Sequence, residues 1–248
     1  MKQKNNMIKG VILAGGLGKR LEPLTRITNK HLLPVGNKPM IYYPLETLVE
    51  AGIKDIMIVT GGNNAGDFLR LLGNGDEFGL KHINYTYQRG ERGIADALSL
   101  AEHFAARSKI VVILGDNVIE KSIKKYVSAF MRQPKGARIL IKEVLDPERF
   151  GVVELKGEKI ISIEEKPKRP KSKYIVTGIY MYDKQVFDII RTLKPSWRNE
   201  LEITDVNNAY LKKGQLDYDI LKGYWTDCGT FDSLWRATNL VANKYKRK

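Results

Sequence analysis

Cysteine and long apolar segments are the two features that this chain of 248 residues has least of. Its one cysteine, Cys228, excludes an intrachain disulfide and gives no support to an oxidising compartment. The longest apolar runs, such as residues 110–114, are far shorter than the roughly 20 residues that span a bilayer. The polar start at residues 1–6 does not resemble a signal peptide. We therefore expect a cytoplasmic protein that does not associate with membranes.

Acidic residues are scarce relative to basic ones. The chain has 28 Asp and Glu against 42 Lys and Arg, a formal net charge of +14. Such a charge attracts phosphates, whether on nucleic acid, a membrane surface or a small substrate. The basic residues are spread along the chain, and no helix-turn-helix, zinc spacing or stacking-aromatic signature accompanies them. Nucleic acid is therefore not an expected partner, and the three histidines have no mutual spacing that indicates a metal site.

Short β-rich runs alternate with helical patterns in the first half, which predicts an α/β fold with parallel strands and crossover helices. Strands are expected at 8–14, 54–60, 82–88 and 110–114, and helices at 39–51, 65–72, 94–105 and 123–131. The second half adds strands at 137–144, 151–156, 159–165 and 174–182. A helix to about Lys213 is expected to start at Asn199, with Glu202 completing a capping box, and a final helix from Gly229. This pattern indicates one domain.

A glycine-rich loop follows the first predicted strand and has the sequence Gly15-Gly16-Leu17-Gly18-Lys19-Arg20. Glycines there let backbone N–H groups approach phosphate oxygens. The loop is neither a Walker loop, which needs Gly at position 13 and Ser or Thr at 20, nor a dinucleotide fingerprint, which needs Gly at 21. A tight turn without a ligand is the simpler interpretation. Three glycines followed by two cations favour a phosphate site, with Arg20 stabilising charge on a transferring phosphoryl group.

An ordered series of motifs then covers nearly the whole chain. In the first half they are Leu21-Glu22-Pro23-Leu24-Thr25, Asn29-Lys30-His31-Leu32-Leu33-Pro34-Val35, Lys38-Pro39-Met40-Ile41-Tyr42-Tyr43-Pro44, Gln88 with Gly93-Ile94-Ala95-Asp96-Ala97, and Leu114-Gly115-Asp116-Asn117. In the second half they are Phe150-Gly151-Val152-Val153, Ser162-Ile163-Glu164-Glu165-Lys166-Pro167, Val176-Thr177-Gly178, Glu200-Leu201-Glu202-Ile203-Thr204-Asp205 and Trp225-Thr226-Asp227-Cys228-Gly229-Thr230. Together they resemble the sugar-nucleotidyltransferase family, most closely its glucose-1-phosphate thymidylyltransferase branch in a short form that lacks a C-terminal extension.

The resemblance implies a Rossmann-like mixed, mostly parallel sheet flanked by helices, with an inserted sugar-binding half. Residues 1–7 would be a loose leader, 8–135 the nucleotide-binding half, and 136–248 the sugar-binding half and closing helix of one nucleotidyltransferase domain. The implied reaction is a magnesium-dependent single displacement. A phosphate oxygen of glucose 1-phosphate attacks the α-phosphorus of dTTP, which gives dTDP-glucose and pyrophosphate.

The resemblance also implies roles for individual residues. Catalysis would use Arg20, Lys30, Asp116, Lys166 and Asp227. The nucleotide would be bound by Gly15, Gly16, Gly18, Arg20, Gln88, Gly93 and Asp116. The sugar phosphate would be bound by Gly151, Glu165, Lys166, Thr177 and Arg198. Asp116 and Asp227 would hold Mg²⁺, which usually takes one or two carboxylates and leaves other positions to water and phosphate. Both lie at predicted strand ends, where open α/β sheets bind ligands.

Each motif alone has a simpler interpretation, such as a turn at Asp116, an exposed hairpin end at Glu165 and Lys166, or a buried structural carboxylate at Asp227. The order of the motifs favours an enzyme. Two alternatives for the substrates stay open. UTP could replace dTTP, since a contact with the thymine methyl group discriminates by only about 1–3 kcal/mol, and another hexose 1-phosphate could replace glucose 1-phosphate. A glycosyltransferase, which would usually carry a second Asp near Asp116, and a non-catalytic nucleotide-sugar sensor are less favoured.

Four positions depart from the branch's usual pattern. Lys19 replaces a small hydroxyl residue, His31 replaces glutamine, Cys228 replaces threonine, and Asp96 stands where an amide or glutamate is common. Longer members also carry a further C-terminal helical segment that contributes to subunit contacts and an effector site. We expect a homo-oligomer, without specifying its size.

Overall fold

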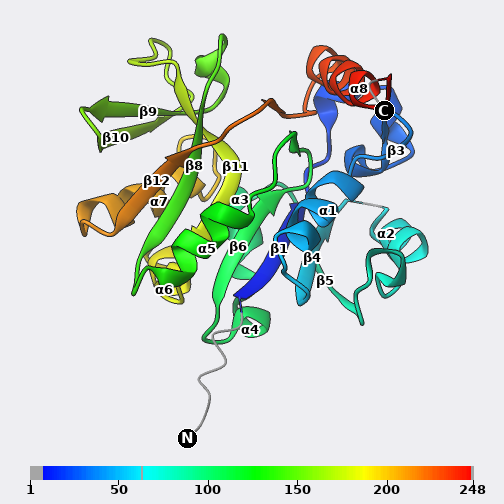
Figure 1. The fold of residues 1–248 in the computed structure, drawn as a ribbon, viewed down its shortest axis with the longest axis horizontal. Helices are drawn as coiled ribbons and strands as arrows, with labels where there is room; N and C mark the ends of the chain where they lie inside the picture. The colour runs from blue at the N-terminus through cyan, green and yellow to red at the C-terminus, as the bar shows by residue number, and fades with distance from the viewer. Residues whose placement is uncertain (1–7, 63, 247–248) are drawn as a thin grey trace, which may run out of the picture.

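The computed structural model describes residues 8–62 and 64–246, so the loose leader predicted for residues 1–7 lies outside the described residues. Within these ranges nine strands form one central sheet (Figure 1). They are β1 (Ile8–Ala14), β4 (Ile56–Gly61), β5 (Ile83–Gln88), β6 (Lys109–Leu114), β8 (Ala137–Glu143), β9 (Gly151–Lys156), β10 (Lys159–Glu165), β11 (Tyr174–Tyr182) and β12 (Leu216–Ile220). The order is β10-β9-β11-β6-β1-β4-β5, with β8 pairing to β11 and β12.

The strands of the first half are parallel, as the alternating pattern predicts. β1 pairs with both β4 and β6, so that Ile12 lies opposite Ile58 on one side and Ile113 on the other. β4 pairs in parallel with β5. β11 adds antiparallel pairing to β6 and β8, and the β9–β10 hairpin turns through Gly157. The predicted α/β fold with a mixed sheet flanked by helices is confirmed.

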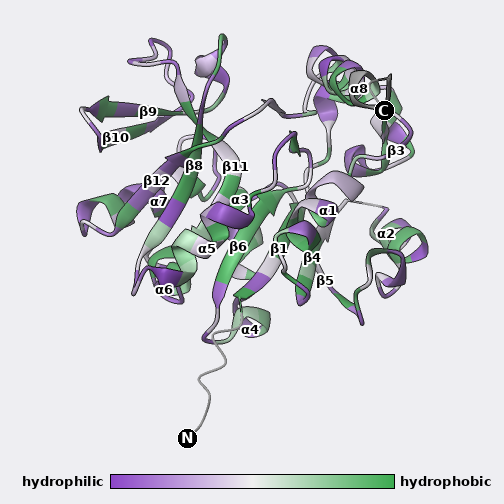
Figure 2. Ribbon diagram, viewed as in Figure 1, coloured by the Kyte–Doolittle hydropathy of each residue, from purple (hydrophilic) through white to green (hydrophobic). Residues whose placement is uncertain are grey.

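Helices cover both faces of this sheet because successive strand residues point to opposite sides. Val11 and Leu13 of β1 belong to the core beneath α3 (Ile94–Ser99), α6 (Gln185–Thr192) and α7 (Ile203–Lys212). Ile12 and Ala14 belong to the core beneath α1 (Tyr42–Glu50), α2 (Ala65–Leu72) and α5 (Lys124–Arg132). Figure 2 shows the hydrophobic residues concentrated in the central strands. The sheet is thus fixed from both sides, and its strand ends form a rigid edge.

A third core lies under the last helix, α8 (Phe231–Lys246), which packs on β2 (Pro34–Val35). β2 pairs with β3 (Lys38–Pro39), and β13 (Trp225–Thr226) pairs with β7 (Val118–Ile119). Because β13 lies beside β7, the residue that follows it, Asp227, comes close to the end of β6. No helix of the described residues is long and apolar enough to cross a membrane.

Three helix predictions need correction. The helix predicted from residue 39 begins at Tyr42, because Lys38 and Pro39 pair with β2. The helix predicted over 94–105 is broken into α3 and the short α4 (Glu102–Ala105). The capping box predicted at Asn199 is wrong. Asn199 has a φ of 59°, and α7 has Glu202 as its N-cap residue.

The physical reason for the last correction is a tertiary contact. The Leu201 N–H donates to the Arg92 carbonyl at 2.9 Å, and its carbonyl accepts from the Ala95 N–H at 3.1 Å. These two bonds hold residues 200–202 extended against the start of α3, so the helix begins only at Ile203. They also fasten the predicted sugar-binding half to the predicted nucleotide-binding half. The pattern of the sequence did not predict α6 or β12.

Candidate active site

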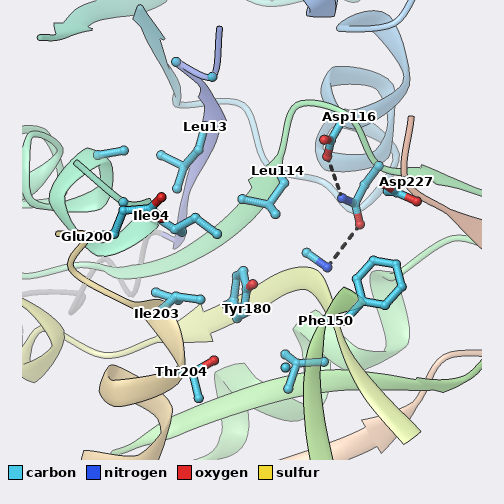
Figure 3. Close-up of a pocket in the computed structure, with 18 of the residues that line it drawn as sticks. Leu13, Ile94, Leu114, Asp116, Phe150, Tyr180, Glu200, Ile203, Thr204 and Asp227 are labelled. Atoms are coloured by element: carbon cyan, nitrogen blue, oxygen red, sulfur yellow. Dashed lines mark hydrogen bonds between the residues drawn. The ribbon is translucent and has the colours of Figure 1, made fainter. Parts of the chain in front are cut away.

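A cavity of about 350 Å³ lies at the carboxyl ends of the parallel strands. Most of the predicted site residues line it: Gly15, Gly16, Arg20, Lys30, Gln88, Gly93, Asp116, Gly151, Glu165, Lys166 and Asp227. In Figure 3, Asp116 and Asp227 lie together on one side of the cavity, and Glu200 and Thr204 on the opposite side. The structure therefore brings together residues that are more than 200 positions apart in the chain.

The glycine-rich loop forms one wall of the cavity at the end of β1. A Cβ atom on Gly15 would lie 2.7 Å from Gln88 Oε1, so a larger residue there would displace the Gln88 side chain at the end of β5. Gly18 stands behind this wall, where it precedes the 3-10 turn Lys19–Leu21 and accepts a hydrogen bond from Thr25. The loop thus exposes its backbone to the cavity through Gly15 and Gly16.

Lys30 and Asp116 form an ion pair at the centre of the site. Lys30 Nζ lies 2.6 Å from Asp116 Oδ2, and each side chain is 13% exposed. Burial favours the neutral acid, but the charge of Lys30 and its hydrogen bond outweigh it and hold the pKa of Asp116 at about 2. Asp116 is therefore a carboxylate at neutral pH.

Asp227 is the second buried carboxylate of the site and is 9% exposed. Arg149 Nη2 donates to its Oδ2 at 3.0 Å, and the Gly229 N–H donates to the same oxygen at 3.2 Å. Burial and then the negative charge of Asp116 raise the pKa of Asp227, despite Arg149. Two carboxylates are thus close enough to repel each other.

This pair is a donor set that suits a hard cation. Mg²⁺ takes oxygen ligands and often only one or two carboxylates from protein. Among the described residues no group of three or more His, Cys, Asp or Glu could hold a metal ion. Burial is the first cause of the raised pKa of Asp227, and repulsion from Asp116 is the second. A cation between Asp116 and Asp227 would relieve this repulsion, so the two residues fit such an ion together with phosphate oxygens and water.

Asn117 ties this region together and was not identified as a site residue from the sequence. Its Oδ1 accepts from Trp225 Nε1 at 2.7 Å and from the Gly178 N–H at 3.2 Å. Its Nδ2 donates to Asp116 Oδ1 at 3.2 Å. One amide thereby joins the loop after β6, strand β11 and strand β13, and fixes the orientation of Asp116.

Arg149 was also missed. It bridges Asp146 at 2.7 Å and Asp227 at 3.0 Å, and its guanidinium lies 5.0 Å from the ring centroid of Phe150. The only signal in the sequence is its place directly before the Phe150-Gly151 motif.

Arg20, which was predicted, lies against Gly229, where a Cβ atom would be 3.0 Å from Arg20 Nη2. The Asp116–Asp227 pair therefore has cations around it: Lys30, Arg20 and Arg149.

His31, one of the four departures, is buried and lines the cavity. Asn29 donates from Nδ2 to the carbonyls of Ala14 and Gly61, so its Oδ1 is the acceptor for His31 Nδ1 at 2.7 Å. Burial, together with the charge of Lys30, lowers the pKa of His31 to about 3. His31 is therefore a neutral ring with the proton on Nδ1.

Gln88 lies at the end of β5 and is 6% exposed. Its Nε2 donates to the Gly93 carbonyl at 3.1 Å and to Asp96 Oδ2 at 2.9 Å. Gly93 has a φ of 98°, and a Cβ atom there would lie 2.4 Å from the Leu201 carbonyl oxygen. A glycine is thus required where the loop after β5 meets the segment before α7.

The opposite side of the cavity carries a network of charges. Thr204 Oγ1 donates to Glu165 Oε2 at 2.6 Å. Arg198 forms its shortest ion pair with Glu200 at 2.6 Å and longer ones with Glu165 at 3.7 Å and Glu202 at 3.6 Å. Several carboxylates therefore share one guanidinium.

Lys166 belongs to the same network and has a left-handed backbone with a φ of 44°. Burial, and then the charge of Arg198, lowers the pKa of Lys166. Three predicted residues do not line the cavity: Gly18, which lies behind the loop, and Arg198 and Thr177. Arg198 is held beside it by its carboxylates, and the hydroxyl of the fully buried Thr177 donates to the Leu140 carbonyl at 2.8 Å.

Comparisons with protein families and with known proteins all indicate nucleotidyl transferases. Residues 9–244 match the model of the nucleotidyl transferase family. A glucose-1-phosphate thymidylyltransferase of Neisseria meningitidis is 45% identical over 238 residues, which cover 94% of this chain and 82% of the relative. One from Mycobacterium tuberculosis is 43% identical over 249 residues, 97% of this chain and 84% of that protein.

Solved structures agree with these relatives. A crystal structure from Bacillus anthracis, described as a candidate glucose-1-phosphate thymidylyltransferase in complex with sucrose, superposes with a TM-score of 0.90 at 55% identity. The match covers 94% of both chains. A UDP-glucose pyrophosphorylase in complex with UDP-glucose has a TM-score of 0.84 at 26% identity, covering 96% of this chain and 99% of that one.

Proposed function

The chain belongs to the nucleotidyl transferase family, and from this premise we propose that it converts dTTP and glucose 1-phosphate into dTDP-glucose and pyrophosphate. Relatives that carry the name of this enzyme and align with nearly the whole chain support the substrate pair. The observation that carries the proposal is the composition of one cavity. The glycine-rich loop, two carboxylates and three cations lie on one side, and Glu165 and Lys166 on the other.

In the proposed reaction, a phosphate oxygen of glucose 1-phosphate forms a bond to the α-phosphorus of dTTP. The bond between this phosphorus and the oxygen that bridges to the β-phosphate breaks, and pyrophosphate leaves with the electron pair. In such transfers the protein forms no covalent intermediate with the substrate. Its contribution to catalysis is mainly to position the substrates and to neutralise charge on the phosphates. We assign these tasks to the loop at Gly15 and Gly16, which would cradle the triphosphate, and to Arg20 and Lys30. Gly18 would support the loop from behind, where its carbonyl accepts from Thr25.

Mg²⁺ would be held by Asp116 and Asp227 and would neutralise negative charge on the phosphates. Lys30 has a double task in this proposal. In the free protein it pairs with Asp116 at 2.6 Å, and with substrates bound its ammonium would move toward phosphate oxygens. Arg149 holds the second carboxylate in place through an ion pair at 3.0 Å. The pKa of Asp227 is raised by burial and then by the charge of Asp116, and this second cause supports a site in which the two acids share a cation.

The sugar phosphate would occupy the opposite side of the cavity. There Lys166 would contact its phosphate, and Glu165, held by Thr204, would accept hydrogen bonds from sugar hydroxyls. Gly151 leaves room for the sugar ring beside Glu165. Arg198 and Thr177 would act from behind the wall, Arg198 by positioning Glu165. Gln88 and the backbone at Gly93 would contact the base. We expect the enzyme to work in the cytoplasm as a homo-oligomer, which light scattering would test.

The test is pyrophosphate release in the presence of Mg²⁺, with dTTP, UTP, CTP, ATP and GTP each combined with glucose 1-phosphate and related sugar phosphates. We expect release that needs both substrates and is fastest with dTTP and glucose 1-phosphate. A preference for UTP would keep the reaction and change the nucleotide, as in the UDP-glucose pyrophosphorylase that shares the fold. A folded protein that binds nucleotide and releases no pyrophosphate with any pair would overturn the proposal in favour of a sensor.

A further inference from the structure

The side-chain amide of Gln88 is held in one orientation by acceptors on its nitrogen side. Nε2 donates to the Gly93 carbonyl at 3.1 Å and to the Asp96 carboxylate at 2.9 Å. If the amide were turned over, Oε1 would face these two acceptors without a proton between them, which is unfavourable in a buried site. Both partners are acceptors, so the amide atom that faces them must be the donor Nε2.

The oxygen of the same amide faces the other way. Oε1 points toward Gly15, where a Cβ atom would be 2.7 Å away, and both residues line the cavity. Among the described residues none donates a hydrogen bond to Oε1. Gln88 thus presents a hydrogen-bond acceptor to the nucleotide side of the cavity.

We infer that Asp96 is a positioning residue for nucleotide selection: it turns the carbonyl oxygen of Gln88 into the cavity, so that the site takes a pyrimidine that carries a hydrogen on N3. This inference rests on the proposed function, which puts the base beside Gln88. Asp96 lies in the first turn of α3 and is anchored by the helix, whereas a residue without an oxygen acceptor there would hold the amide less firmly.

The required donor separates the pyrimidines. Thymine and uracil carry a hydrogen on N3 and can donate to Oε1. Cytosine has a lone pair on N3, which would face the Oε1 lone pairs and leave both acceptors unpaired. A site built around a specific hydrogen bond rejects the analogue that cannot make it much more strongly than an apolar pocket can. Uracil and cytosine have the same ring size and no methyl group. A comparison of dUTP with dCTP therefore tests only the edge of the base that carries N3 and the group on C4.

The experiment compares kcat/KM for dUTP and dCTP with glucose 1-phosphate in the wild-type chain, Asp96→Ala, Asp96→Asn and a control, Glu102→Ala, whose carboxylate pairs with Arg191 outside the cavity. We expect wild type and Glu102→Ala to prefer dUTP equally. Asp96→Ala removes the charged acceptor, so the ratio of the two kcat/KM values should fall about tenfold or more. Asp96→Asn keeps an oxygen acceptor and should retain most of the preference.

A merely structural role of Asp96 would slow both nucleotides alike, and an unchanged ratio in folded Asp96→Ala would overturn the inference. A wild-type chain that uses dCTP as well as dUTP would also overturn it, while leaving nucleotidyl transfer intact. If Asp96→Ala does not fold, Asp96→Leu removes the same acceptor with an apolar side chain of similar size. If wild type releases no pyrophosphate at all, the proposed function fails, and the ratio of dUTP and dCTP dissociation constants tests the inference by itself.

Discussion

The two sides of the cavity hold their polar groups in different ways. In the predicted nucleotide-binding half, residues 8–135, two separate side-chain pairs line the cavity or stand beside it: Lys30 with Asp116, and Gln88 with Asp96. In the predicted sugar-binding half, Arg198 is shared by the surrounding carboxylates at 2.6–3.7 Å. The first side is made of separate pairs on strand ends, and the second is a network.

This difference has consequences for both electrostatics and tolerance to mutation. A dedicated pair keeps its charge, as the pKa of about 2 for Asp116 indicates. In the network, burial lowers the pKa of Lys166 and raises that of Glu202, so charges there are less firmly held. A substitution on the nucleotide side should therefore act locally, whereas one in the network should change several contacts at once.

The largest effect is expected where the two carboxylates meet. Asp116→Asn removes a proposed metal ligand and the partner of Lys30, and we expect kcat to fall by roughly a thousandfold or more. Asp227→Asn should act similarly. Pyrophosphate release at saturating substrates measures the loss, and circular dichroism should show an intact fold. Asp217→Asn, an exposed acid that pairs with Arg138, is the matched control. A rate within tenfold of wild type in both site variants would remove the metal assignment.

The junction between the two sides is the next target. Gly93→Ala would place a Cβ atom 2.4 Å from the Leu201 carbonyl oxygen, at a φ of 98° that other residues rarely adopt. Backbone strain of this kind costs about 1–3 kcal/mol, and the clash adds to it. We expect Tm to fall by about 5 °C or more, and KM to rise for both substrates, because residues 200–202 shift with the loop. Gly90→Ala, also at positive φ but with no atom near the added Cβ, separates the clash from the conformational strain. Equal Tm changes in the two variants would show that the contact with Leu201 does not matter.

A substitution at Lys166 tests whether the sides act separately. Lys166→Ala removes a cation from the network, and we expect KM for glucose 1-phosphate to rise about 10- to 100-fold, as for loss of a charged hydrogen bond. KM for dTTP should change less than about threefold. Lys171→Ala, an exposed lysine on the same loop that pairs with Glu154, should leave both constants unchanged. Equal increases for the two substrates would contradict the division of the cavity.

The same comparison explains what could be predicted from the sequence. Strands β1, β9, β10 and β11 and helix α2 have the predicted bounds, because their apolar periodicity is local. The start of α7 was wrong because hydrogen bonds from Leu201 to Arg92 and Ala95 override the capping signal. β12 has a half-buried, acid-containing sequence whose pairing with β8 depends on tertiary contact.

For the candidate site, motifs identified the residues that lie directly after strands, such as Gly15, Gly16 and Asp116. They did not assign a role to Asn117 or Arg149, whose roles depend on distant partners. Asn117 and Trp225 are 108 positions apart, and Arg149 reaches Asp227 from 78 positions away. No local pattern encodes such a contact. Asp96 was noticed as a departure, but its meaning depended on the position of Gln88. The roles assigned to these residues stay predictions until the variants are measured.

The smallest effect is expected at the mouth of the cavity, where Lys19 and Glu91 form an ion pair at 2.8 Å. Lys19 stands where the resemblance predicts a small hydroxyl residue, and its side chain is 68% exposed. Because exposed pairs contribute little and are screened by salt, we expect Lys19→Ser to change KM for dTTP by less than about threefold. The change should disappear as the salt concentration is raised to about 0.5 M, because the Debye length falls from about 10 Å at 0.1 M toward about 3 Å at 1 M. A tenfold increase in KM that persists at high salt would instead place Lys19 in direct contact with the triphosphate. Lys19 would then leave Glu91 when the nucleotide binds, and the nucleotide side would no longer consist of separate fixed pairs.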